Sequence, residues 1–434
     1  MPVWDSGLIV NRGIARTEQV TVSLVNRGWR RQTVTLQIYT LEPDRTGPGC
    51  VHENERCTLP LESAGRSGSA WSWSANVSEL PAFGVRIGAA GPGAQGLVVS
   101  ALQFGADGQL LASRTLEAAQ WGPEEPGLAF VVNHTQHTVT AVQTAGGWHA
   151  ATIDMGDGSL PRQIAVTADG SRAFVTCQGD KTVKIVDTVL QSVCGELTFP
   201  ERAVPFAVAA SPVGRKIYAT TLVEEYAAVV DAAEGAFIRL IRLPKGSDPS
   251  AVAMSPDGTK AYCCLAGAGA VAVIDAEQDR LITTVKLPPG SQPSAAAFAP
   301  GGEYAYIADA GLDQVHIIRT RSNAVCGTIE LDRGSSPQHL AVTPDEALIY
   351  AACSRSDEIA VLNPLLRKVL TTIELPGGSS PSALAMTPDG LKVLAAMLAF
   401  GYVAAIDVQS QQPVAIIPTG GFPSSVAVSP CLFL

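Results

Sequence analysis

The chain has 434 residues, enough for two hydrophobic cores. Apolar residues make up 46% and charged residues only 16%, with 41 glycines and 29 prolines, which is typical of a turn-rich, well-buried protein and excludes a disordered one. A net charge of −10 without a basic run argues against nucleic-acid binding, and no stretch approaches the roughly 20 apolar residues of a membrane-spanning helix.

The first 120 residues have the pattern of short strands separated by turns. Alternating β-branched, aromatic and polar residues predict four strands at Val20–Asn26, Gln32–Thr40, Phe83–Ile87 and Leu97–Phe104. We therefore expect residues 1–120 to form a small antiparallel β-sandwich of the immunoglobulin-like kind.

The order of the segments VTVSLVNRG, QTVTLQIYTL and SELPAFGVRI is similar to that of small sandwich domains in bacterial cell-surface and spore-surface proteins. This resemblance implies a role at a surface. In contrast, the start MPVWDSGLIVNR has no basic segment followed by an apolar one, which predicts a cytoplasmic protein. The sequence leaves both locations open.

Nine cysteines are present, and several lie within apolar strand patterns, where a free thiol packs as a small hydrophobic group. Cys50 and Cys57 differ because both lie in the polar loop GPGCVHENERC, and they are the candidates for a disulfide across it. Zinc would need more ligands than His52 adds there. We predict no metal site.

Residues 121–126, with two prolines and two acidic residues, predict a short stiff connector. Residues 127–434 then contain a repeat, in which a proline opens a short apolar run that ends in a turn, as in PRQIAVTADG, PSAVAMSPDG and PSALAMTPDG. The spacing is 44 residues five times and then 42. The seven copies begin at Pro161, Pro205, Pro249, Pro293, Pro337, Pro381 and Pro423.

Each copy contains four apolar stretches, for example QIAVT, RAFVTC, TVKIVD and SVCGELTF. A four-stranded unit with a period of roughly 40 to 45 residues is typical of a β-propeller blade, so we predict an all-β protein with a seven-bladed propeller. Innermost strands crowd around the axis, and the fourth residue after each proline is small: Ala165, Ala209, Ala253, Ala297, Ala341, Ala385 and Ala427.

The last copy ends at Leu434, directly after its first strand, and would leave a blade with unpaired edges. Strand patterns ahead of the first proline match a blade's second, third and fourth strands; they are Leu128–Asn133, Thr138–Gln143 and His149–Met155. We predict that the C-terminal strand pairs with this first blade and closes the ring.

Four second strands end in FVVN, FVTC, YATT and YAAC. On these endings, together with the period, the chain resembles the YVTN-type β-propeller repeat proteins from about Gly127 to Leu434. The resemblance implies the fold and leaves the function open.

Common catalytic and cofactor motifs are absent from the sequence, including GxSxG, GxxxxGK[ST], HExxH, the EF-hand loop and CxxCH. We therefore predict no cofactor and assign no catalytic residue. The residues two after each proline, expected beside a central channel, are mostly small: Gln163, Ala207, Ala251, Ala295, His339, Ala383 and Ser425.

Antiparallel blades place the loops between the second and third strands on the same face as the loops from each fourth strand to the next first strand. We call this the loop face and predict that it binds a protein partner or a small polar ligand. Its candidate residues are Asp180, Lys181, Glu224, Glu225, Tyr226, Asp309, Asp313, Arg355, Asp357, Glu358, Phe400 and Tyr402.

The leading functional hypothesis from the sequence is a non-enzymatic scaffold for binding or assembly, through a protein partner, self-assembly or a surface structure. It depends on a repeat fold without a catalytic constellation. The alternative is a propeller enzyme of the lactonase or lyase type that acts on a small molecule at the loop face, an analogy from fold alone.

Overall fold

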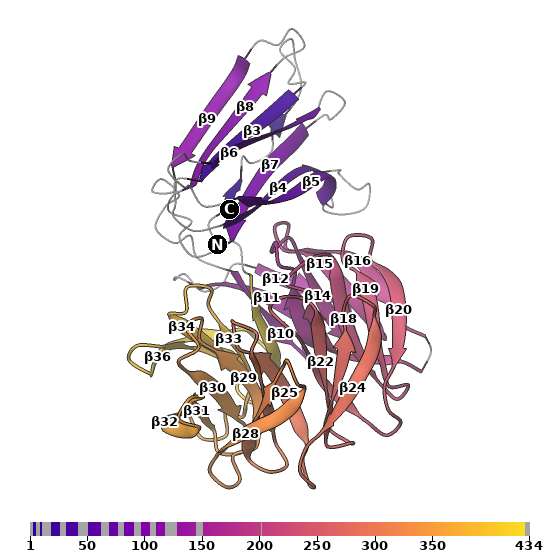
Figure 1. The fold of residues 1–434 in the computed structure, drawn as a ribbon, viewed down its shortest axis with the longest axis vertical. Coiled ribbons are helices and arrows are strands. Elements are labelled where there is room, and N and C mark those ends of the chain that lie inside the picture. The colour runs from indigo at the N-terminus through magenta and orange to yellow at the C-terminus, as the bar shows by residue number, and fades with distance from the viewer. Residues whose placement is uncertain are drawn as a thin grey trace. The chain divides into compact units, whose positions relative to one another are not determined.

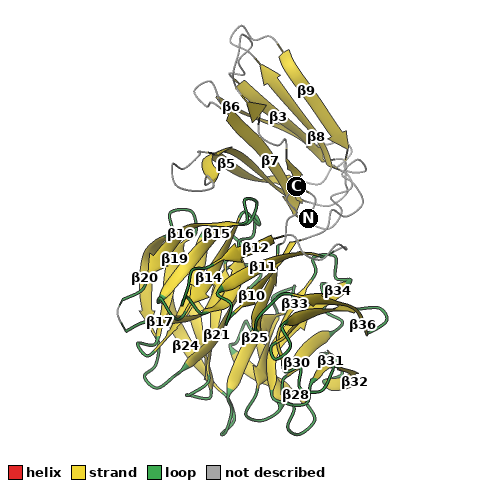
Figure 2. Ribbon diagram, turned by 180° about the vertical axis from the view of Figure 1, so that it is seen from behind, coloured by secondary structure: helices red, strands yellow, loops and turns green. Residues whose placement is uncertain are grey.

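The structure is a computed structural model in which residues 128–144, 151–200 and 202–429 are described in full. Of residues 1–127, only strand backbones between residues 3 and 117 are described. The chain divides into two compact units, one built on Met1–Gly127 and the other on Leu128–Ser429, and each is considered by itself. All regular elements in the described parts are strands (Figures 1 and 2). No described helix is long and apolar enough to cross a membrane.

The first unit contains two antiparallel sheets, in the strand orders β1-β7-β4-β5, with β2 beside β7, and β6-β3-β8-β9. The four predicted strand segments fall in β3, β4, β7 and β8. That the two sheets pack as a sandwich stays a prediction, and Cys50 and the side chain of Cys57 lie outside the described residues. The bounds are β1 (Val3–Asp5), β2 (Ile9–Val10), β3 (Gln19–Asn26), β4 (Gln32–Leu41), β5 (Val51–Leu61), β6 (Ser69–Asn76), β7 (Ala82–Ala90), β8 (Leu97–Phe104) and β9 (Leu110–Glu117).

The second unit is a seven-bladed propeller, as predicted, and each blade is a four-stranded antiparallel sheet. The first two blades are β37-β10-β11-β12, with β10 (Leu128–Asn133), β11 (Thr138–Gln143), β12 (Ala151–Asp154) and β37 (Pro423–Val428), and then β13 (Pro161–Val166), β14 (Arg172–Cys177), β15 (Thr182–Asp187) and β16 (Ser192–Thr198). The third and fourth are β17 (Val204–Ala210), β18 (Lys216–Leu222), β19 (Tyr226–Asp231) and β20 (Ala236–Arg242), and β21 (Pro249–Met254), β22 (Lys260–Leu265), β23 (Ala270–Asp275) and β24 (Arg280–Lys286).

The remaining three blades repeat this arrangement. They are β25 (Pro293–Phe298), β26 (Tyr304–Asp309), β27 (Gln314–Arg319) and β28 (Ala324–Glu330), then β29 (Pro337–Val342), β30 (Ile349–Cys353), β31 (Glu358–Asn363) and β32 (Lys368–Glu374), then β33 (Pro381–Met386), β34 (Lys392–Met397), β35 (Tyr402–Asp407) and β36 (Gln412–Pro418).

The ring closes through the C-terminal strand, which confirms the prediction. β37 pairs antiparallel with β10, with Ala129 opposite Val428 and Val131 opposite Val426. Without β37, the strand β10 would expose an unpaired edge at the centre of the ring.

The hydrophobic core lies between the blades. Successive side chains of a strand point to opposite faces of its sheet, so each second strand contributes to two interfaces. Cys263 packs between blades three and four, and Cys264 packs between blades four and five, as their adjacency predicts. Burial raises the pKa of Cys263 to about 12, which keeps this thiol protonated and unreactive near neutral pH.

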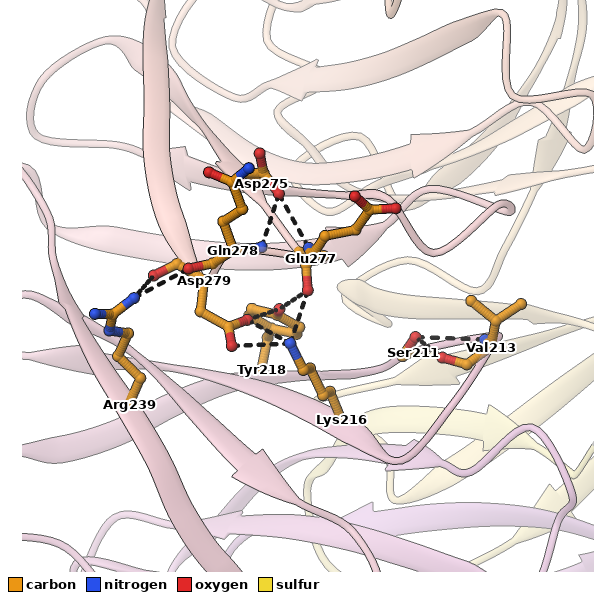
Figure 3. A network of polar contacts seen from close by, with 10 residues as sticks. Ser211, Val213, Lys216, Tyr218, Arg239, Asp275, Glu277, Gln278 and Asp279 are labelled. Carbon is orange, nitrogen blue, oxygen red and sulfur yellow. Dashed lines mark hydrogen bonds and ion pairs between the residues drawn. The ribbon is translucent and has the colours of Figure 1, made fainter.

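On the face opposite the loop face, groups of hydrogen bonds and ion pairs, which we call clasps, connect neighbouring blades (Figure 3). Lys216 Nζ of blade three lies 2.8 Å from Asp279 Oδ2 of blade four, and the Tyr218 hydroxyl donates to Asp279 Oδ1 at 2.7 Å. Burial and this hydrogen bond raise the pKa of Tyr218. The next interface is similar, since the Tyr262 hydroxyl donates to Asn323 Oδ1 at 2.8 Å.

We predict that a chain truncated after Gly421, which lacks β37, loses its single cooperative unfolding transition and several kcal/mol of unfolding free energy. A chain truncated after Ser429 keeps β37 and is the matched control. Urea unfolding followed by circular dichroism measures both. Equal stability of the two truncated chains would contradict closure by β37.

Asp279→Ala should lower the free energy of unfolding by about 1 to 3 kcal/mol, because it removes the carboxylate that accepts from Lys216 and Tyr218 and leaves both donors only the carbonyl of Ala276. Glu277→Ala in the same turn is the control, because Glu277 is exposed, and its effect should stay within about 0.5 kcal/mol. Urea unfolding compares them. Equal effects would show that the clasp contributes no stability.

Candidate functional site at the loop-face end of the propeller axis

Each innermost strand begins with a β-bulge next to its proline. In blade two, Pro161 pairs with Cys177 and Gln163 pairs with Thr176, so Arg162 and Gln163 together oppose one residue. Register shifts occur at the start of the innermost strand in every other blade as well. A bulge interrupts the strict alternation of side chains between the two faces of a strand. Both residues after the proline can therefore face the propeller axis.

Where the first residue after the proline is serine, its hydroxyl connects neighbouring innermost strands. Ser250 Oγ donates to the carbonyl of Pro293 at 2.6 Å, and Ser294 Oγ donates to that of Pro337 at 2.6 Å. The first and second residues after the proline together form what we call the axis ring. Its first positions are Arg162, Phe206, Ser250, Ser294, Gln338, Ser382 and Ser424, and its second positions are Gln163, Ala207, Ala251, Ala295, His339, Ala383 and Ser425.

At three junctions the second position accepts a backbone N–H group of the next blade. Gln163 Oε1 accepts from Val208 N at 2.9 Å, His339 Nδ1 from Leu384 N at 3.3 Å, and Ser425 Oγ from Ile164 N at 3.4 Å. At the other four junctions this position is alanine, which has no acceptor. The equivalent N–H groups therefore lack a side-chain partner of this kind; they belong to Val252, Ala296, Leu340 and Val426.

His339 presents a hydrogen-bond donor to the ring. Burial lowers the pKa of His339 to about 4, so the imidazole is neutral near pH 7. Because Nδ1 accepts the Leu384 N–H group, the proton of the neutral ring lies on Nε2. Nε2–H is then the hydrogen-bond donor of the neutral His339 imidazole.

Arg162 is the single Lys, Arg, Asp or Glu on the seven innermost strands. Its guanidinium carbon lies 5.2 Å from the centroid of the Phe206 ring. Burial lowers the pKa of Arg162, and within residues 128–144, 151–200 and 202–429 its guanidinium has neither a hydrogen-bond acceptor nor a carboxylate partner. Arg162, Gln163, Phe206, Gln338 and His339 are all partly exposed.

Sequence reasoning identified the second positions of the ring and missed the first. Strict alternation from the proline places the residue two positions later on the axis side, whereas the bulge brings the intervening residue there too. The signal was present, because Arg162, Phe206 and Gln338 stand where the other four copies have serine.

Three of the predicted loop-face residues are acceptors for the neighbouring loop. Asp313 accepts from Gly334 N and Ser336 N at 2.7 Å each, and Asp357 accepts from Gly378 N at 2.7 Å. Glu225 accepts from Ser247 N at 2.6 Å. These three residues share a left-handed backbone with φ of 52° to 55°, which directs each side chain over the adjoining loop.

The other predicted loop-face residues lie on the same side but form separate groups. Asp180 pairs with Lys184 at 3.1 Å, and the Tyr226 hydroxyl accepts from Arg242 at 3.1 Å. The rings of Phe400 and Tyr402 stack with centroids 5.7 Å apart. Of the remainder, Lys181 and Arg355 are exposed, whereas Glu224 and Glu358 are partly buried.

Asp309, also predicted for the loop face, is fully buried together with His316. Its Oδ2 lies 2.8 Å from His316 Nε2, and its Oδ1 accepts from Gln292 N at 2.8 Å. Burial alone would raise the pKa of Asp309, but the hydrogen bonds from His316 and Gln292 outweigh it and hold the pKa below its usual range. No cluster of three metal-binding side chains occurs among the described residues.

A family model for a lactonase with a seven-bladed β-propeller matches residues 286–430, less than half of the chain. Hydrazine synthase of Kuenenia stuttgartiensis is similar in structure, with 22% identity, a TM-score of 0.56 and coverage of 65% of this chain and 92% of that one. A functionally unknown protein from Desulfotomaculum acetoxidans has 16% identity, a TM-score of 0.60 and coverage of 70% and 98%. Dihydro-heme d1 dehydrogenase NirN has 14% identity, a TM-score of 0.53 and coverage of 71% and 78%. No curated protein matches the chain.

The match to the lactonase model corrects the leading functional hypothesis from the sequence. A non-enzymatic assembly scaffold was expected because no catalytic motif could be found, and that expectation is wrong. The match favours the alternative, an enzyme-like or ligand-binding propeller. The similar structures are all less than 25% identical and support the fold alone.

Asp309→Asn should remove a pH-dependent part of the stability. A carboxylate with a lowered folded-state pKa stabilises the protein above its unfolded pKa of about 3.9, and this stabilisation is lost as the pH falls through the folded value. The gap in unfolding free energy between wild type and Asp309→Asn should therefore shrink from pH 6 toward about pH 3. Urea unfolding across that range measures the gap, with the exposed Asp332→Asn as control. A gap independent of pH would contradict this role.

Proposed function

We propose that this propeller is an enzyme of the lactonase type that acts on a small molecule at the loop-face end of its axis. The observation that carries the proposal is the family match over residues 286–430, which include Gln338 and His339 of the axis ring. Gln163, Gln338 and His339 of the ring are partly exposed and supply hydrogen-bonding groups of the kind that a small ligand needs.

Lactone hydrolysis adds water to the ring carbonyl and breaks the ring C–O bond, and the departing oxygen takes a proton to give a hydroxy acid. Negative charge develops on the carbonyl oxygen during attack, and donors aimed at that oxygen stabilise it. The axis ring offers His339 Nε2–H and backbone N–H groups for this purpose. In this proposal His339 binds the carbonyl oxygen as a donor, because its Nδ1 already accepts the Leu384 N–H group.

Three finer assignments belong to the same proposal. We propose that the repeats are of the YVTN type, on the second-strand endings. We propose that residues 1–120 form a sandwich related to surface domains, joined by residues 121–126 to the propeller. Finally, the exposed loop-face residues, such as Arg355 and Phe400, would make the outer contacts of a ligand.

The proposal predicts that the purified protein hydrolyses at least one member of a panel of γ- and δ-lactones, measured as acid release in a pH-stat. His339→Ala should lower kcat/KM at least about a hundredfold through loss of one donor. His339→Gln is the matched variant, because Gln163 makes the equivalent bond to the next blade, and its fold should stay intact. A panel without turnover, or full activity in His339→Ala, would refute the proposal.

A further inference from the structure

We propose that Arg162 is an oxyanion-binding residue, and that the ligand of the axis ring carries a carboxylate or phosphate group held by its guanidinium. This inference rests on the proposed function only in placing a small ligand at the axis. It adds the charge of that ligand and the residue that recognises it.

No carboxylate within residues 128–144, 151–200 and 202–429 pairs with Arg162, although the chain is rich in acids. The protein has 40 acidic and 30 basic residues, yet none of the acids lies on an innermost strand. Placing a partly buried guanidinium without a counter-ion is unfavourable, since a buried charge normally has a partner. A bound anion would supply the missing partner.

Three acids of the loop face are already engaged elsewhere. Asp313 and Asp357 accept backbone N–H groups of the adjoining loops, and Asp180 forms an ion pair with Lys184. Reorienting any of them toward Arg162 would break these bonds. The positive charge at the axis therefore stays available to a ligand.

The guanidinium of Arg162 lies over the ring of Phe206. Arginine stacks on aromatic rings through its planar face, and the 5.2 Å separation from the Phe206 centroid is within the range of such contacts. A contact made through that face would leave the N–H edge for two parallel hydrogen bonds. Two oxygens of a carboxylate or phosphate can accept from the paired N–H groups of that edge. A lysine ammonium has no such planar pair of donors.

Other polar groups of the axis ring favour an acceptor-rich ligand as well. Gln163 uses its carbonyl oxygen for Val208 N, so its amide nitrogen is left to donate. His339 donates through Nε2–H, and the serine hydroxyls at the first positions already donate to carbonyls of the next blade. A ring that offers donors and one positive charge is complementary to an oxyanion.

Titration calorimetry on the full-length protein at low salt tests the inference with four probes. 4-Hydroxybutyrate is the carboxylate, inorganic phosphate is the second oxyanion, and 1,4-butanediol and γ-butyrolactone are neutral controls of similar size. We expect one of the two anions to bind at the axis, more tightly than either neutral probe and more weakly as salt rises. The anion that binds identifies the source of the oxyanion.

Arg162→Gln should weaken binding of that anion at least about tenfold, and Arg162→Lys should give an intermediate affinity, because it keeps the charge without the fork. Arg321→Gln is the control, since Arg321 is exposed in the turn between β27 and β28 on the opposite face. Circular dichroism confirms that each variant is folded, and Arg162→Lys keeps the test valid if Arg162→Gln is not.

Binding of neither anion, or equal binding by wild type and Arg162→Gln, overturns the inference. These outcomes are separate from those of the lactone assay. Anion binding that depends on Arg162, without hydrolysis of any lactone, would leave the inference standing and refute the proposed activity. Lactone hydrolysis that is unaffected by Arg162→Gln, together with no anion binding, would support the proposed activity and overturn the inference about Arg162.

Discussion

The close approach of seven innermost strands around one axis is the constraint on which the rest of the propeller depends. It explains the alanine at the fourth position after every proline, and it explains why serine and alanine dominate the axis ring. Small hydroxyl groups there bond to the carbonyl of the next blade, as Ser250 does to Pro293, so packing and hydrogen bonding favour the same residues. This packing and hydrogen bonding do not account for the large or charged residues in the axis ring, such as Arg162 and Phe206.

Ring closure also determines how the polar residues are used. On one face, Lys216 and Tyr218 bond to Asp279 of the following blade, and on the loop face Asp313 and Asp357 bond to the loop of the following blade. Since each blade buries its hydrophobic faces only against its neighbours, such bonds fix the angle between sheets whose core packing is non-directional. Carboxylates that seem free in the sequence, such as Asp279, Asp313 and Asp357, therefore have structural roles.

The fold could be predicted from the sequence because the same pattern of strands and turns occurs seven times. The 44-residue period, the alanines and the incomplete last copy sufficed for blade number and for closure by β37. The candidate site was less accessible. A bulge next to each proline changes the direction in which one residue faces, and the single copy PRQIAV does not reveal it. Only the comparison of the seven copies, four of which have serine at this position, distinguishes Arg162. Likewise, the hydrogen bonds that occupy Glu225 and Asp313 join the loop between the second and third strands to the loop that leads to the next blade, and no local pattern predicts them.

The departures from the repeat are more informative about function than the repeat itself. Gln163, His339 and Ser425 substitute for one another as acceptors for the next blade, so their differences are tolerated by the fold. Arg162 has no such structural bond, and Phe206 beside it replaces a serine that would have made one. The serine-to-carbonyl hydrogen bonds between innermost strands are thus missing at the first positions of blades two and three. Arg162, which stands there, is the one side chain on the innermost strands that carries a full charge.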